Sequence, residues 1–306
     1  MPHATRPSTN ESAFVLSALR ENFRLDSRAL DQYRPISLQF PSDPDVYGQT
    51  DVRIGKTRVI CNVSCEVISP YPDRKFDGVF NISCELSPLI GAGVEIGRYE
   101  YQNQAELLLS RLLEKSIRRS NALDTESLCI IAGQKCFHVR ADLHVLDHDG
   151  SILDACCLAL VAALQHFRRP DYEVHGEQVT VFDVREREPV KLTLQHQPFC
   201  VTTSYYDAGT IMVQDATLLE EQCREGEIVM SMNRHGEVCQ IAKYGGVPVD
   251  ALSVLSVVKQ SWEKVKMMDA VVREALSKDE RDRDKGGRMK AELSAENERV
   301  MERPVG

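Results

Sequence analysis

The chain has 306 residues, a formal net charge of −9 and 42% hydrophobic residues, a composition typical of a globular protein large enough for two subdomains. The negative charge argues against a protein that coats nucleic acid nonspecifically, because phosphate binding normally requires a basic surface. The longest apolar run, from Ala155 to Leu164, is half the length of about 20 residues that a bilayer-spanning helix needs, so we expect no membrane contact. The ten cysteines never form the two-residue-spaced pairs of a zinc ribbon, and we interpret them as reduced thiols of an intracellular protein.

The first part of the chain predicts a short helix followed by a sheet. Ser8 and Glu11 have the spacing of a capping box and place an N-terminal helix within residues 1–24. Residues 35–86 contain several runs in which apolar and polar side chains alternate, as they do in strands. A helix is then expected from about residue 100 to 119. Three aliphatic residues should form its buried stripe: Leu109, Leu113 and Ile117.

The stretch at residues 135–167 carries the clearest pattern. Apolar and polar residues alternate from Phe137 to Val145, which predicts a strand with one buried face. Residues 151–167 are apolar on nearly every side, so they should form a helix buried between two layers, with Asp154 as its only charged residue. The first amide groups of such a helix are unpaired and attract anions. We therefore expect function at this junction, although Asp154 already places negative charge there.

The second half repeats the plan of strands followed by a helix. Four strands are expected: 197–206, 211–215, 226–233 and 237–243. A long helix should follow at about 249–276. Six apolar residues are expected to face inward from it: Leu252, Leu255, Val258, Trp262, Val265 and Val272. The sequence thus predicts an α+β protein with a first lobe at 25–190, a second lobe at 191–276, each a β-sheet packed with helices, and a charged, disordered tail at 277–306.

Two further patterns resemble ligand sites but have simpler explanations. Residues 55–57 (GKT) end like a phosphate-binding P-loop, yet the upstream glycine that lets such a loop wrap phosphate would fall at Thr50. The polar residues between His144 and Asp149 suit a metal ion and leave a metal-dependent small-molecule enzyme as one hypothesis. His144 and His148 would nevertheless lie about 13 Å apart on a strand. A polar strand end and a helix cap explain these residues, so we expect no metal site and no cofactor.

The helix at 100–119 has a basic side opposite its buried stripe. Four cationic residues at spacings of three and four share that side: Arg111, Lys115, Arg118 and Arg119. Arg74 adds a fifth cation in the predicted loop at 71–76. One interpretation is a solvated helix face on which Glu114 pairs with Arg118. The other is a local contact for RNA phosphates.

Several segments together resemble the RNase PH family, and within it the ring subunits of the eukaryotic RNA exosome. The resemblance covers roughly residues 10–275. It rests on these segments: 19–28 (LRENFRLDSR), 71–74 (YPDR), 117–124 (IRRSNALD), the strand and turn at 135–150, 175–178 (HGEQ), 185–190 (REREPV) and 243–246 (KYGG).

The resemblance implies an RNase PH-like fold with two lobes and a place in a six-membered ring built from three head-to-tail pairs of related subunits. Single-stranded RNA threads such a ring toward a hydrolytic exoribonuclease subunit, and RNA-binding cap subunits dock on it. The implied processes are rRNA processing and RNA degradation in the nucleus, nucleolus and cytoplasm. On this view five basic residues line the RNA path: Arg74, Arg111, Lys115, Arg118 and Arg119.

The same resemblance implies a degenerate catalytic site. Active relatives carry Gly-Gly-Thr-Arg-Thr after the aspartate of the turn, whereas this chain has Ile152, Leu153 and Asp154 at the last three positions. Two donors and a cation are exchanged for two apolar groups and an anion, and two like charges about 4 Å apart repel by roughly 4 kcal/mol near a protein surface. The paired catalytic aspartates of active relatives fall at Glu221 and Glu227, which a simpler interpretation takes as surface glutamates. The implied function is a non-catalytic ring subunit, and the alternative is an active phosphate-dependent 3′–5′ exoribonuclease.

Overall fold

The first lobe is built on a six-stranded sheet with the order β1-β2-β3-β6-β4, and β5 pairs with the beginning of β6. The computed structural model describes residues 7–283 except 42, 44–45, 88–98, 177, 183–185 and 247. The strands of the first lobe are β1 (Ile36–Gln39), β2 (Gln49–Ile54), β3 (Thr57–Ile68), β4 (Val79–Leu86), β5 (Cys129–Ile131) and β6 (Lys135–Asp147). β4 is parallel to β6, and the other pairs of this sheet are antiparallel.

The predicted strand and buried helix at the centre of the chain are confirmed. β6 buries its alternate apolar residues: Phe137, Val139, Ala141, Leu143 and Val145. The helix that follows, α3 (Ile152–His166), is buried at every position from Leu153 to Leu164. It lies between the first sheet and the second, so apolar side chains are favourable on all of its sides. This double burial explains why the segment lacks helical amphipathicity.

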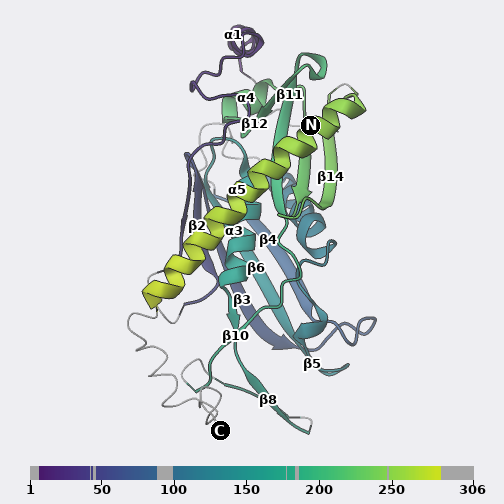
Figure 1. Cartoon of the computed structure of the whole chain (residues 1–306). Helices are drawn as coiled ribbons and strands as arrows, with labels where there is room; N and C mark the ends of the chain where they lie inside the picture. The colour runs from purple at the N-terminus through teal and green to yellow at the C-terminus, as the bar shows by residue number, and fades with distance from the viewer. Residues whose placement is uncertain are drawn as a thin grey trace.

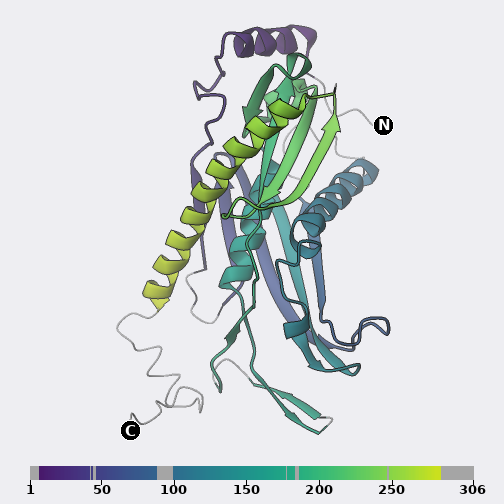
Figure 2. The same ribbon diagram turned by 45° about the vertical axis from the view of Figure 1, so that its right-hand side comes forward.

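The second lobe is a four-stranded antiparallel sheet with the order β12-β11-β13-β14. Its strands are β11 (Phe199–Tyr206), β12 (Ile211–Gln214), β13 (Gly226–Met232) and β14 (Val238–Gly245). Two helices belong to it: the short α4 (Leu218–Cys223) and the 33-residue α5 (Ala251–Arg283). Figures 1 and 2 show α5 crossing the molecule obliquely, from the second sheet down to the first lobe.

The remaining elements are short and peripheral. They are α1 (Thr9–Arg20), the 3-10 turns η2 (Glu126–Leu128) and η3 (Asp207–Gly209), and the strands β7 (Arg168–Arg169), β8 (Tyr172–His175), β9 (Gln178–Val181) and β10 (Val190–Lys191). α1 lies at one end of the molecule and the β8–β9 hairpin at the opposite end (Figure 2). The predicted Ser8–Glu11 capping box is present at the start of α1. No helix among the described residues is both long and apolar enough to cross a membrane.

The predicted basic helix ends in an irregular turn. α2 (Tyr99–Leu113) lies along β4 and continues into a π-helical segment, η1 (Glu114–Arg118). Leu113 and Ile117 are buried as predicted, and Leu109 packs against the core while half-buried. The wider π turn brings the Ser116 hydroxyl to the second lobe, where it donates to Gln240 Oε1 at 3.0 Å. The segment thus joins the basic helix to both lobes.

The predicted end of the last helix and the predicted start of the disordered tail are wrong. α5 continues beyond residue 276 to Arg283, whereas residues 284–306 lie outside the described part of the chain. Arg283 donates to the carbonyl oxygens of Pro41 and Val46 at 3.2 and 3.1 Å, and its Nε pairs with Asp279 at 2.7 Å. The mixed charge of residues 277–283 is therefore used in specific contacts with the first lobe, which a composition argument treats as solvated.

The predicted inward face of α5 is also partly wrong. Leu252, Leu255 and Trp262 are 74%, 59% and 36% exposed. Val265 and Val272 are buried as predicted, and the rest of the buried stripe consists of Val257, Ser261, Met268 and Asp269. Helical periodicity shows which residues share a side, but the neighbouring sheet decides which side is covered. Here the largest apolar residues lie beside the covered side.

Candidate functional site

The turn between β6 and α3 is held by the second lobe. Gly150 has a φ of +89°, and a Cβ atom there would collide with the carbonyl oxygen of Ala216. Ser151, the residue before α3, is left-handed as well, with a φ of 56°. Only a residue without a side chain fits at Gly150, because the loop after β12 packs directly on the turn. The junction predicted to carry function is therefore a contact between the two lobes.

Asp154 is buried inside the lobe contact. Its carboxylate accepts hydrogen bonds from Tyr33 Oη at 2.8 Å and from the Thr202 amide and hydroxyl at 3.0 and 2.7 Å. The Ser151 hydroxyl donates a fourth at 3.1 Å. Burial raises the pKa of Asp154 to about 6, although the bonds from Thr202 and Tyr33 oppose the rise. The prediction that Asp154 repels a ligand at the turn is thus corrected, since its carboxylate is fully buried and ties three segments together.

A different carboxylate occupies the turn. Glu221, on α4, accepts a hydrogen bond from the Ser151 N–H through Oε1 at 2.7 Å. Burial raises the pKa of Glu221 to about 7, while Arg224 and the Ser151 N–H lower it. Arg224 lies between the two predicted acid positions, 2.7 Å from Glu227 Oε2 and 3.8 Å from Glu221 Oε1. The anion-binding amide before α3 therefore already has an anion of this chain.

Ile152 and Leu153 contribute nothing polar to the turn. Leu153 is buried in the core, and Ile152 packs against it. The Arg34 guanidinium contacts the turn, where it pairs with the buried Asp215 at 2.7 Å and donates to the carbonyl oxygens of Asp149 and Gly150. Its guanidinium is thus engaged with acceptors of this chain and holds the turn.

His148 is also unavailable as a cation. Its Nδ1 accepts the Gly150 N–H at 3.1 Å. Burial and the charge of Arg34 lower the pKa of His148 to about 4, so the imidazole is neutral at pH 7. The turn consequently offers a phosphate ion neither a hydroxyl nor an unpaired positive charge from these residues.

The sequence did not reveal how the N-terminal segment holds this region. Arg24 is completely buried, bonds both carboxylate oxygens of Glu220 at 3.0 and 2.6 Å and donates to the carbonyl oxygens of Gln214 and Asp215. Arg28 adds a bond to Asp215 Oδ2 at 2.8 Å. The arginines at 24 and 28 lie in a segment that carries the family resemblance, but these partners are 187 to 196 residues away. No local pattern predicts such pairs.

The predicted basic strip is exposed, and its members differ in their partners. Arg111 and Arg118 share Glu114, at 3.1 and 3.6 Å. Lys115 and Arg119 are exposed, and within the described residues no carboxylate pairs with them. The interpretation as a solvated face thus describes Arg111 and Arg118, whereas a contact of Lys115 and Arg119 with RNA phosphates stays a prediction.

Arg74 lies toward the same end of the first sheet as the end of the strip. It is an exposed residue of the turn between β3 and β4. At the end of β4, the Leu86 amide donates to Glu106 of α2 at 2.9 Å. Just before β4, the Gly78 amide donates to the Thr125 carbonyl oxygen at 2.8 Å, so α2 and η1 run antiparallel to β4. The segment after η1 therefore returns to the turn that contains Arg74.

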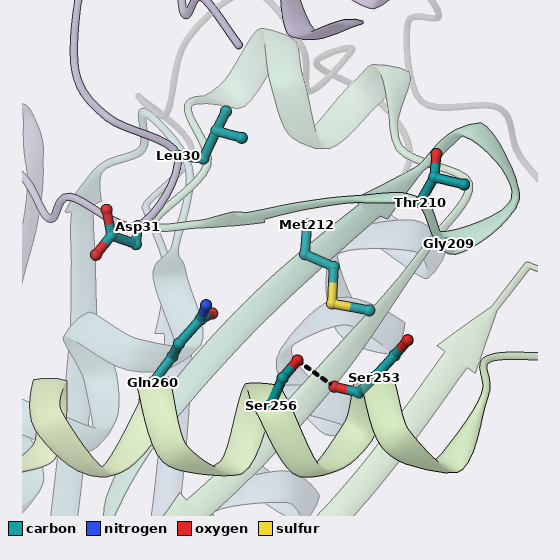
Figure 3. Close-up of a pocket in the computed structure, with 8 residues that line it drawn as sticks. All are labelled: Leu30, Asp31, Gly209, Thr210, Met212, Ser253, Ser256 and Gln260. Carbon is teal, nitrogen blue, oxygen red and sulfur yellow. Dashed lines mark hydrogen bonds between the residues drawn. The ribbon is translucent and has the colours of Figure 1, made fainter.

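A separate pocket of about 390 Å³ lies between α5 and β12. Figure 3 shows Met212 pointing toward three polar residues of α5. The lining residues are Leu30, Asp31, Gly209, Thr210, Met212, Ser253, Ser256 and Gln260. None is cationic, so the pocket does not suit phosphate. Among the described residues, no group of three or more His, Cys, Asp or Glu side chains is placed to hold a metal ion.

Comparison with protein families decides the relationship. The model of domain 1 of the 3′ exoribonuclease family, RNase PH, matches residues 32–170, and the model of its domain 2 matches residues 196–264. The chain belongs to the RNase PH family. The first match contains the strands of the first sheet and the second match those of the second sheet, and the predicted RNase PH-like α+β fold is confirmed.

Individual proteins of the RNase PH family show which of its members this chain is similar to. Exosome complex component rrp45 of Schizosaccharomyces pombe is 46% identical over 295 residues, which cover 95% of this chain and 97% of that protein. RRP45 of Saccharomyces cerevisiae is 42% identical over 306 residues, covering 96% and 98%. A solved structure, the Archaeoglobus fulgidus exosome with RNA bound to the active site, matches with a TM-score of 0.72 and 28% identity over 85% of this chain and 97% of that one. The resemblance to eukaryotic exosome subunits, of the type also called exosome component nine, is thus confirmed.

Proposed function

We propose that this RNase PH-family chain is a non-catalytic ring subunit of the RNA exosome. Its role is structural: it contacts other RNase PH-like subunits, lines part of the path of single-stranded RNA and offers docking surfaces to cap subunits and to a hydrolytic exoribonuclease. It thereby serves 3′–5′ RNA processing and decay, in nucleus, nucleolus and cytoplasm. The similarity to exosome components over nearly the whole chain supports ring membership.

The bond from the Ser151 N–H to Glu221 carries the non-catalytic part of the proposal. Phosphorolysis needs inorganic phosphate held in line with the terminal RNA linkage, and its charge must be offset by donors or cations in the transition state. At this turn an internal carboxylate takes the amide, and Ile152 and Leu153 supply no replacement. Loss of one such donor typically lowers a rate about 10²- to 10³-fold, and several are missing.

The competing hypothesis is an active phosphate-dependent exoribonuclease. It is favoured by the acids at Glu221 and Glu227, which lie where active relatives carry aspartates. Arg224 neutralises this pair, however, at 2.7 Å from Glu227. Glu227 is thus engaged with Arg224, and Glu221 accepts the Ser151 N–H, so both carboxylates are occupied by groups of this chain. We therefore favour the scaffold hypothesis.

The decisive experiment measures release of nucleoside diphosphates from single-stranded RNA in the presence of phosphate. The assembled ring is made with the wild-type chain and with its hydrolytic subunit inactivated. We expect no phosphate-dependent release. Release that disappears with Glu227→Gln but persists with Glu225→Gln, an exposed neighbour, would establish the enzyme hypothesis instead.

A variant designed to gain phosphate binding tests why the turn should not bind phosphate. Ile152→Thr with Leu153→Arg restores a hydroxyl and a cation and leaves Asp154 intact, because that carboxylate holds the lobes together. Adding Glu221→Ala removes both the internal carboxylate and the acceptor of the Ser151 N–H. We expect phosphate binding in calorimetry to rise only in the triple variant. Equal binding with and without Glu221→Ala would show that this carboxylate does not block the site.

A further inference from the structure

An exposed apolar flank runs along the beginning of α5. Leu252, Leu255 and Trp262 follow one another at spacings of three and seven residues, which places them on one side of the helix. Val257 and Val265, on the neighbouring side, are fully buried against the second sheet. The flank therefore lies next to the side of α5 that packs on the second sheet, but its own side chains do not pack on that sheet.

β14 presents apolar side chains next to this flank. It is the last strand of its sheet, and Figures 1 and 2 show it as the outer strand beside the first turns of α5. Gln240 contacts Ser116 of η1, so Ile241 points to the opposite face, which α5 covers over β11 and β13. Ile241 is 54% exposed and Val238 is 42% exposed. A β-bulge places both opposite methionines of β13, so they share one face despite their spacing of three.

Trp262 connects the helix flank with the strand. Its Nε1–H donates to the carbonyl oxygen of Arg234 at 3.0 Å, in the turn between β13 and β14. A Cβ atom at Gly236, in the same turn, would lie 3.3 Å from the indole. The indole therefore links the exposed apolar flank of α5 to the turn that precedes β14. The α5–β14 surface consists of Val238, Ile241, Leu255 and Trp262.

Three lysines border the α5–β14 surface. Lys243 extends from the same face of β14 as Ile241, and Lys266 lies over the indole of Trp262 at 3.4 Å from its centre. Lys259 is exposed on α5, seven residues before Lys266. In the described part of the chain no carboxylate pairs with these three lysines. A partner that supplies acidic groups here is favoured by charge.

The outer edge of β14 completes the site. Among the described residues, β14 pairs only with β13, so its other side presents unpaired backbone donors and acceptors. A backbone edge flanked by an apolar surface is the arrangement that an added strand recognises, because main-chain bonds give affinity and side-chain contacts give specificity.

We propose that the α5–β14 surface binds an extended segment of another protein of the assembled exosome. The segment pairs with the edge of β14, sets apolar side chains beside Val238 and Ile241 and places an acidic side chain beside Lys243. The identity of the assembly rests on the proposed function. The extended conformation of the segment follows from the strand edge, and its acidic side chain follows from the lysines that border the surface.

Photo-crosslinking in the reconstituted assembly tests this. Benzoylphenylalanine replaces Ile241 in one preparation and Ala270, an exposed residue two turns beyond Trp262 on α5, in the control. We expect a crosslink from position 241 to one segment with alternating apolar residues and an Asp or Glu, at a yield at least about tenfold above the control. No crosslink above the control, or a crosslink to a helix or to RNA, overturns the proposal.

Charge reversal tests the chemistry of the segment. Lys243→Glu should lower the crosslink yield about two- to fivefold, and a Lys in place of the acidic residue of the captured segment should restore it. An unchanged yield overturns the assigned chemistry. Co-elution of the wild-type chain with the ring subunits is measured first. Failure to co-elute refutes both proposals, whereas co-elution without the crosslink refutes this one alone.

Discussion

Glu221 is a carboxylate held where its ionisation is unfavourable. Its pKa is raised to about 7 by burial, compared with 4.5 for an unperturbed glutamate. The folded state therefore binds the proton more tightly than the unfolded state. The stability that results is fully present below pH 4.5 and is lost as the pH rises through 7.

Glu221→Gln should remove this pH dependence, because the amide oxygen still accepts the Ser151 N–H but carries no charge. Between pH 5 and 8 the wild-type chain should lose up to about 3 kcal/mol of unfolding free energy relative to the variant. Urea unfolding of both proteins at several pH values measures the difference. Glu225→Gln is the control. A constant difference across this range would show that the Glu221 pKa is ordinary.

Arg24 presents the opposite case, a buried charge that is fully paired. Arg24→Ala leaves the Glu220 carboxylate buried without its partner and should lower the unfolding free energy by about 3–5 kcal/mol. Arg20→Ala, four residues earlier, removes an exposed pair with Asp207 and should cost less than about 1 kcal/mol. Denaturant midpoints measure both. Similar losses of unfolding free energy in both variants would mean that the buried Arg24–Glu220 pair contributes no more than the exposed Arg20–Asp207 pair.

At the scale of elements, the last turn of α5 fastens the loop before β2 to the end of α3. Arg283 bonds that loop and lies over the Tyr47 ring at 4.8 Å. His166, at the end of α3, accepts the Gly48 N–H through Nδ1 at 3.0 Å, and its Nε2 lies 3.2 Å from Asp279. One helical turn thus contacts two elements of the first lobe.

Arg283→Ala should release this loop without unfolding the lobes. Hydrogen exchange of the amides of Val46 and Gly48 should accelerate at least about fivefold, because the loop would keep fewer of its bonds. Arg281→Ala, an exposed position in the same turn, should leave the rates unchanged. Equal exchange in both variants would return residues 277–283 to the frayed tail that composition predicts.

At the scale of the whole molecule, the open cations of the basic strip should act on RNA in the assembled ring. Lys115→Glu with Arg119→Glu should weaken RNA crosslinking regardless of sequence and reduce the salt dependence, because phosphate contacts carry no base information. Arg111→Glu with Arg118→Glu should have a smaller effect, since Glu114 already neutralises part of that charge. A larger effect from Arg111→Glu with Arg118→Glu than from Lys115→Glu with Arg119→Glu would contradict the assignment of Lys115 and Arg119 as the RNA contacts.

Ring assembly should also stabilise the chain. Heterologous ring contacts of permanent complexes commonly bury more than about 2,000 Å², and a partner that binds only the folded state raises the melting temperature. Thermal unfolding of the chain with and without the other RNase PH-like subunits checks this. A soluble monomer whose melting temperature is the same with and without those subunits would contradict ring membership.

The sequence by itself determined the parts that depend on local spacing. Alternation specified β6, uniform apolarity specified the double burial of α3, and the Ser8–Glu11 spacing specified the cap of α1. The motifs also identified the family. These features are readable because strand and helix periods are properties of the backbone alone.

Only the tertiary structure decided the roles of the charged groups and the covered side of α5. Asp154 was expected to face a ligand, yet its donors Tyr33 and Thr202 come from opposite directions along the chain. Glu221 was aligned as a catalytic acid, yet it binds the amide of Ser151, seventy residues earlier. Helical periodicity places Leu252, Leu255 and Trp262 on one flank of α5. In the folded chain the second sheet does not cover that flank, so these residues stay exposed. The partners of a carboxylate and the cover of a helix face are set by distant segments, so no local pattern contains them.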